Sequence, residues 1–172
     1  MKIAVFFANG TEEIEALTPV DVFRRCNIEC DVISVSGKNP TGSHNISIVA
    51  DKEIENVNLN EYSAFVVPGG MPGAENIANN QKVVLALKQA YKKGKLIAAI
   101  CASPAVVFSQ KNIVSGKKMT CYPSEIFIKK IGCFYSEKDV EIEDNVITAN
   151  GPKSAMKFAL SICEKLQLTP KF

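Results

Sequence analysis

The chain has 172 residues, of which 47% are hydrophobic and 22% are charged, and its formal net charge is +2. This length fits one domain, residues 1–172, with a substantial buried core. The small net charge argues against nucleic acid or an anionic membrane as the principal partner, and the apolar N-terminal run is too short to cross a membrane.

Short apolar runs bounded by turn residues predict strands, which occupy residues 3–7, 32–35, 46–49, 64–67, 96–100 and 146–149. Apolar side chains at helical spacing predict helices at residues 12–25, 82–93, 102–110, 124–131 and 153–166. Strands that alternate with helices predict a mostly parallel sheet covered on both faces. Antiparallel excursions are expected at residues 37–50 and in a hairpin that turns at Asp144 and Asn145.

The predicted fold is therefore α/β: a flavodoxin-like three-layer α/β/α sandwich with a mostly parallel central sheet and a small antiparallel hairpin. In such sheets, ligand sites lie beyond the carboxyl ends of the strands. Three of the predicted strand ends carry residues that suit chemistry at this position.

The strand at residues 96–100 runs directly into Cys101, which is followed by Ala102, Ser103 and an apolar helical pattern. This order of strand, nucleophile and helix is that of a nucleophile elbow. The positive end of a helix and its unpaired amides favour a thiolate, so we predict that Cys101 is reactive. The alternative is a small buried apolar side chain, which is the usual state of a cysteine.

The strand at residues 3–7 leads to a turn, to Thr11 as a candidate N-cap, and to Glu12, Glu13 and Glu15. Glu12 and Glu13 suit the positive start of a helix. Glu15 lies among apolar residues, from where it would point at the centre of the sheet. Beside a thiolate it would be held protonated and would donate a hydrogen bond. The alternative for Glu15 is a solvated carboxylate.

The third strand end is the glycine-rich segment VVPGGMPGAEN. Gly69 and Gly70 permit close approach of the backbone to a ligand, and their amides are candidate donors to an oxyanion. The alternative is a glycine-rich turn without a ligand. The segment matches neither GxGxxG nor a phosphate-binding P-loop, so we expect no nucleotide, flavin or other cofactor.

Six cysteines without an export signal predict free thiols in a reducing compartment, and hence a cytoplasmic protein. Cys26 and Cys30 are separated by three residues, but no second pair follows at metal-binding spacing. His44 is the only histidine. We therefore predict no metal site.

Five segments of the chain resemble, in order, those of the DJ-1/ThiJ/PfpI family, in a branch with deglycase-like members: GTEEIEALTPVDVFRR, SGKNP, VVPGGMPGAEN, LIAAICASPAVV and ITANGP. The resemblance implies a flavodoxin-like fold and a homodimer. It also implies that Cys101 is the reactive cysteine, that Glu15 is its carboxyl partner, and that the amides of Gly70 and Ala102 line an oxyanion pocket.

The sequence departs from its wider relatives at two positions. Ala102 stands where protease-like members have a histidine, so peptidase activity is not expected, and no histidine is present for an amidotransferase dyad. Tyr122 stands where many close relatives have a histidine; with a pKa near 10, it is a poor proton shuttle.

The neighbouring Cys121 is either a resolving thiol or part of the core. His44 is either an exposed loop residue or reaches the pocket of a neighbouring subunit.

The resemblance implies a cysteine-dependent, stress-protective enzyme that acts on reactive carbonyls, of the glyoxalase or protein deglycase type. Its partners would be a small aldehyde such as methylglyoxal, or glycated protein adducts. Cys101 would attack the aldehyde and Glu15 would move a proton, in a pocket formed by Gly69, Gly70, Ala102 and Tyr122. The alternative is a redox sensor or chaperone-like protein whose Cys101 is oxidised to sulfinic acid, with little turnover.

Overall fold

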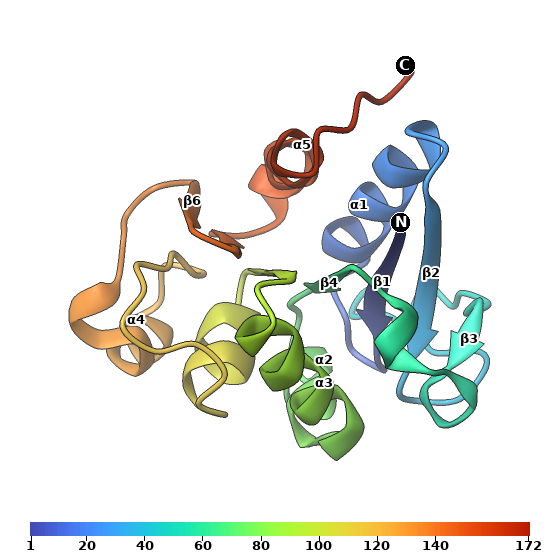
Figure 1. Cartoon of the computed structure of the whole chain (residues 1–172). Helices are drawn as coiled ribbons and strands as arrows, with labels where there is room; N and C mark the ends of the chain where they lie inside the picture. The colour runs from blue at the N-terminus through green and yellow to red at the C-terminus, as the bar shows by residue number, and fades with distance from the viewer.

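The computed structural model describes all 172 residues and contains one seven-stranded sheet in the order β3-β2-β1-β4-β5-β7-β6 (Figure 1). All neighbouring strands pair in parallel except β6 and β7, which form the predicted antiparallel hairpin. The strands are β1 (Lys2–Phe7), β2 (Glu29–Ser34), β3 (Lys52–Glu53), β4 (Ala64–Val67), β5 (Leu96–Ile100), β6 (Val140–Glu143) and β7 (Val146–Ala149).

Helices cover both faces of this sheet. They are α1 (Glu13–Arg25), α2 (Gly73–Asn79), α3 (Gln81–Lys92), a π-helical segment (Pro104–Ser109), α4 (Glu125–Ile131) and α5 (Ala155–Lys165). Helices α1 and α5 lie on one side of the sheet, and α2 and α3 lie on the other (Figure 1). The predicted flavodoxin-like three-layer sandwich is confirmed.

The central strands are mostly apolar because both of their faces are buried. In β1, Ala4 and Phe6 pack with α2, α3 and the π-helical segment, whereas Ile3, Val5 and Phe7 pack with α1 and α5. Every residue of β4, β5 and β7 is likewise buried. Each large apolar side chain buried in this way contributes roughly 1.5–3 kcal/mol, so the strand ends that carry the site are held rigidly.

Two sequence-based expectations were wrong, and one helix was missed. Residues 46–49 form no strand; the excursion has a single antiparallel bridge between Thr41 and Ser47, and Val49 is 71% exposed because it faces solvent rather than the core. The edge strand is β3 instead, and helix α2 was not foreseen after the glycine-rich turn. Thr11 is not the N-cap of α1, because its hydroxyl accepts a hydrogen bond from the Ala8 amide within the preceding turn.

The order of the strands determines where a site can form. The chain runs from β1 to β2 on one side and returns to place β4 on the other side of β1, so the direction of winding reverses between β1 and β4. Loops that follow neighbouring strands diverge at such a point and leave a crevice. No helix of this fold has both the length and the apolar character needed to span a membrane.

Candidate functional site

The three strand ends singled out in the sequence meet at one place. Cys101 follows β5, Gly69 lies just beyond β4, and Glu15 lies in the first turn of α1, which follows β1. A Cβ atom built on Gly69 would lie 2.6 Å from Cβ of Cys101 and 2.7 Å from Oε2 of Glu15. Gly69 is therefore the contact point between the cysteine and the carboxyl group, and it has no space for a side chain.

The backbone of Cys101 is in the left-handed region, with φ +64°. This conformation costs a non-glycine residue roughly 1 kcal/mol or more and persists only where the surroundings hold it. Here both peptide groups are fixed, since the Cys101 amide donates to the Ala149 carbonyl (2.9 Å) and its carbonyl accepts from the Tyr122 amide (2.7 Å). The predicted sharp turn is present, and it lifts the thiol out of the line of β5.

Ser103 reinforces this turn. Its buried hydroxyl donates a 2.5 Å hydrogen bond to the carbonyl of Pro68, and so joins the turn after β5 to the end of β4. From the sequence, Ser103 is recognisable only as a small neighbour of the cysteine. A serine flanked by apolar residues in a buried turn was the signal that this hydroxyl needs a partner.

Glu15 is completely buried and only partly satisfied. Its Oε2 accepts a 2.9 Å hydrogen bond from the Gly69 amide, whereas Oε1 is buried without a regular hydrogen-bond partner. The Cys101 thiol is the polar group that interacts with this carboxyl. The alternative of a solvated Glu15 is therefore wrong, because the side chain points at the sheet and reaches the cysteine.

The environment of Glu15 shifts its ionisation towards neutral pH. Burial raises its pKa from the ordinary value of 4.5 to about 7, while the Cys101 thiol and the Gly69 amide act in the opposite direction. A buried carboxyl with a pKa near 7 exchanges a proton readily at physiological pH. This is the property required of a general acid or base.

Cys101 differs from the resting thiolate that we expected. Burial and then the charge of Glu15 raise the pKa of its thiol to about 12, against the opposing effect of the Gly70 and Ala102 amides. No α-helix begins at Cys101, because the regular turns start only at Pro104 and are π-helical, so the expected helix dipole is weak. The Cys101 thiol is therefore protonated at rest, beside the carboxyl group of Glu15.

The predicted pocket amides lie beside the sulfur. Gly70 and Ala102 both direct backbone N–H groups at Cys101. Gly70 has φ +83°, and a Cβ there would lie 2.3 Å from the Glu12 amide nitrogen, so only glycine fits where the turns after β1 and β4 touch. Two amides that converge beside a nucleophile can stabilise an oxyanion.

Tyr122 contributes its backbone rather than its hydroxyl. Its amide holds the Cys101 carbonyl, while its ring, 45% exposed, lies near Gly151 and borders a cavity of about 440 Å³. The other residues around this cavity are Pro123, Asn150, Pro152 and Lys153. Cys121 is fully buried in the core and burial raises its pKa to about 12, which favours the core interpretation over a resolving thiol.

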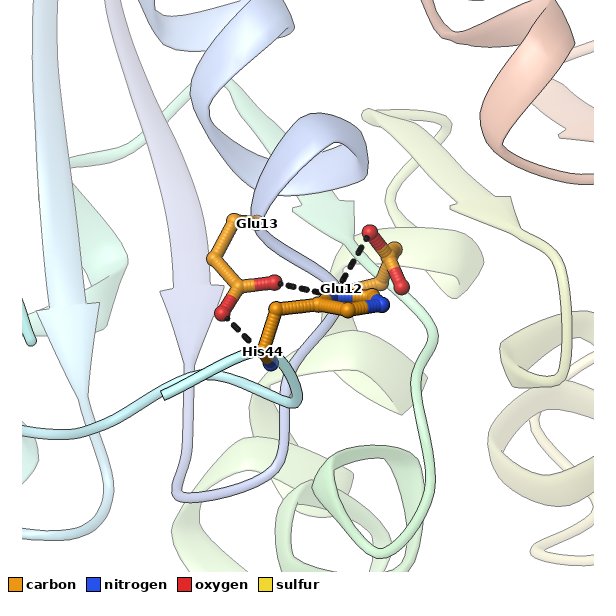
Figure 2. Close-up of side chains that lie close together, drawn as sticks. All are labelled: Glu12, Glu13 and His44. Carbon is orange, nitrogen blue, oxygen red and sulfur yellow. Dashed lines mark hydrogen bonds and ion pairs between the residues drawn. The ribbon is translucent and has the colours of Figure 1, made fainter. Parts of the chain in front are cut away.

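His44 is exposed but paired, as Figure 2 shows. Its Nδ1 lies 3.0 Å from Oε2 of Glu13 and 3.5 Å from Oε1 of Glu12, and its amide donates to Oε1 of Glu13. The hydrogen bond to Glu13 raises the pKa of His44. Burial opposes ionisation of Glu13, but hydrogen bonds from His44 and from nearby backbone amides together outweigh burial and lower its pKa.

The three donor groups lie within 4.8 Å of one another, but both oxygens of Glu13 already accept hydrogen bonds from the excursion. We therefore describe Glu12, Glu13 and His44 as an ion-pair cluster. It ties residues 37–50 to the start of α1, one turn away from Glu15.

Comparisons with known proteins agree with this architecture. The DJ-1/PfpI family matches residues 1–165. The chain is 36% identical over 166 residues to the Parkinson disease protein 7 homolog of Danio rerio, covering 94% of this chain and 87% of that protein. It is 33% identical over 168 residues to protein DJ-1 homolog B of Arabidopsis thaliana, covering 96% of this chain but only 38% of that protein. Oxidised DJ-1 of Toxoplasma gondii superposes with a TM-score of 0.91 at 39% identity, over 96% of this chain and 90% of that chain.

Proposed function

The chain belongs to the DJ-1/PfpI family, and we propose that it is a cysteine-dependent enzyme acting on small reactive carbonyls, of the glyoxalase or protein deglycase type. The observation that carries this proposal is the contact between the Cys101 thiol and the buried carboxyl of Glu15, whose pKa is raised to about 7. A nucleophile in contact with a base that titrates near neutral pH is the arrangement that covalent catalysis requires.

The first step is addition to the aldehyde. Glu15 accepts the proton of the Cys101 thiol as the sulfur attacks the aldehyde carbon, and the carbonyl electron pair moves onto oxygen to give a hemithioacetal alkoxide. The amides of Gly70 and Ala102, which already point at the sulfur, stabilise the new negative charge beside it. The thiol does not need to be ionised at rest, because deprotonation and attack are coupled.

The second step moves a proton between the two substrate carbons. With methylglyoxal, Glu15 moves the proton of the former aldehyde carbon to the neighbouring ketone carbon. The ketone carbon then bears a hydroxyl group, and the former aldehyde carbon becomes the carbonyl carbon of a thioester. Water then breaks the carbon–sulfur bond, which releases lactate and returns the proton to the cysteine. The net reaction is methylglyoxal plus water to lactate, with no redox partner required.

Lactate formation from methylglyoxal tests this proposal. We expect the wild type to turn over, and Cys101→Ala and Glu15→Gln each to lose about 100-fold or more in kcat/KM. Cys133→Ala is the matched control, because Cys133 is an exposed free thiol away from the strand ends. If the wild type is inactive, or if all four proteins turn over alike, the proposed activity is wrong.

Redox sensing at Cys101 is the second candidate function. Its specific support is the unpartnered Oε1 of Glu15, which in its protonated form would donate to a sulfinate oxygen and stop oxidation at that stage. Mild hydrogen peroxide followed by peptide-resolved mass spectrometry separates the two functions. Selective addition of two oxygens at Cys101, without lactate formation, would favour the sensor; oxidation spread evenly over the exposed cysteines would reject it.

A homodimer located in the cytoplasm completes the proposal. Exposed apolar side chains on α1 and the excursion support self-association, since Ile14 is 54% exposed, Ile46 52% and Val49 71%. Isolated exposed apolar residues are common, but neighbouring ones mark interaction surfaces. Sedimentation equilibrium of the wild type and of Val49→Asp tests the dimer: we expect the substitution to weaken it, and a monomeric wild type would reject it.

A further inference from the structure

Two cysteines that are far apart in the sequence lie in direct contact, away from the Cys101 site. The sulfur atoms of Cys26 and Cys163 are 3.7 Å apart across 137 positions of the chain. Cys26 caps the C-terminal end of α1, and Cys163 lies in α5, which packs beside α1 on the same face of the sheet. No other two sulfur atoms of the structure are in such contact, although all six cysteines are free thiols.

The two thiols differ in their exposure. Cys163 is 1% exposed, whereas Cys26 is partly exposed to solvent. Burial, and then the hydrogen bond with Cys26, raise the pKa of Cys163 to about 12, so the Cys163 thiol stays protonated. Either sulfur can donate the hydrogen bond between them. The partly exposed sulfur of Cys26 is the one that an oxidant in solution reaches first.

The geometry permits a bond between the two sulfur atoms. A disulfide needs a sulfur–sulfur distance of about 2.05 Å, so the pair at 3.7 Å must close by less than about 2 Å. Cys26 lies at the end of its helix and is followed by Asn27 in a left-handed turn, so its side chain is not enclosed by a further helical turn. Cys163 is held in place by the core and presents a stationary partner.

We propose that Cys26 and Cys163 form a redox-active pair that hydrogen peroxide converts to an intramolecular disulfide joining α1 to α5. The sulfur of Cys26 attacks one peroxide oxygen and breaks the O–O bond, which gives a sulfenic acid and one water. The Cys163 sulfur then attacks the Cys26 sulfur, and its proton leaves with the hydroxyl as a second water. Two thiols are oxidised by two electrons in total, and one peroxide is reduced to two waters.

The bond would fix the helix that carries Glu15. A cross-link that closes a loop of this length restricts the unfolded chain strongly, and so stabilises the folded form. We expect the oxidised protein to melt on the order of 5–10 °C above the reduced protein. The proposal is independent of the carbonyl chemistry, because neither cysteine contacts the strand ends that form the candidate site.

The test uses the full chain with Cys101→Ala, so that oxidation of the candidate nucleophile cannot interfere. We expect peroxide treatment to lower the intact mass by the two hydrogens of one disulfide, to produce a peptide pair that joins Cys26 to Cys163, and to raise the melting temperature. All three effects should reverse with dithiothreitol. Adding Cys133→Ser should change none of them, whereas adding Cys26→Ser should abolish all three.

Direct detection of the joined peptides in the Cys101→Ala protein avoids reliance on Cys163→Ser, which alters a buried position. The proposal is overturned if Cys26 gains oxygen without forming the link. It is also overturned if the link joins two different chains, as a dimer on non-reducing gels. Recovery of both thiols unchanged, under conditions that oxidise the exposed Cys133, overturns it as well.

Discussion

Replacement of Glu15 by glutamine should make Cys101 easier to ionise while it slows catalysis. Glutamine has nearly the same shape, keeps an oxygen for the Gly69 amide, and places a neutral NH₂ group where the unpartnered Oε1 lies. The charge of Glu15 is the second-largest cause that raises the pKa of the Cys101 thiol. Its removal should therefore lower that pKa, whereas the loss of the base should reduce kcat/KM about 100-fold or more.

The size of the fall in the Cys101 pKa follows from the repulsion between the Cys101 thiolate and the Glu15 carboxylate. Two unit charges about 4 Å apart interact by up to about 4 kcal/mol at an effective dielectric constant near 20, and water at the partly exposed thiol reduces this value. We expect the pKa to fall by about 1–2 units, at about 1.4 kcal/mol per unit. Each unit raises the thiolate fraction about tenfold, but the lower basicity cancels nearly half of that gain in rate. Alkylation should accelerate about 3- to 10-fold.

The assay is the rate of iodoacetamide alkylation at Cys101 as a function of pH, resolved by peptide mass spectrometry so that the exposed Cys133 is counted separately. The rate at Cys133 in the same sample is the internal control and should not change. Slower alkylation of Cys101 in Glu15→Gln would refute the reasoning. It would mean that the wild-type carboxyl already holds the proton and stabilises a resting thiolate.

Three further outcomes are expected. The pKa of Glu15 is about 7 in the folded chain and 4.5 in a free glutamate, so the folded state loses stability as the pH rises between these two values. Glu15→Gln should therefore raise the free energy of unfolding by up to about 3 kcal/mol at alkaline pH and hardly at all near pH 4.5. Urea denaturation at the two pH values measures this difference. Gly69→Ala should cost about 1–3 kcal/mol and displace the thiol of Cys101, because its Cβ overlaps both site residues, as thermal melting and alkylation rates will show. In NMR titrations, His44 should titrate above 6.5, and Glu13→Gln should return it towards that value.

The strand ends could be predicted because they follow from local patterns with one physical meaning. An unbroken apolar run such as residues 96–100 is stable only when both faces are covered, and the cysteine at its end must then occupy a turn. The same reasoning failed for residues 46–49. The side chains of Ile46 and Val49 are exposed to solvent in the monomer while Ile48 packs against the core, and neither alternation nor composition reveals this arrangement.

The electrostatic state of the site could not be predicted from the sequence. Its glutamate and cysteine were found from their neighbours in the chain, but the pKa of each depends on burial and on the distance between residues 86 positions apart. Helix-end reasoning predicted a thiolate for Cys101, whereas burial and the charge of Glu15 oppose it. The contact between Cys26 and Cys163 was equally invisible, because it arises only when α1 and α5 pack on one face.

The pH dependence of kcat/KM for methylglyoxal tests the central claim most directly. If ionised Glu15 takes the proton of Cys101 during attack, kcat/KM should rise with pH through a single ionisation near 7, the pKa that burial gives this carboxyl. The low residual activity of Glu15→Gln should lack that ionisation. A wild-type profile that is flat through neutral pH, or the same ionisation persisting in Glu15→Gln, would contradict the account.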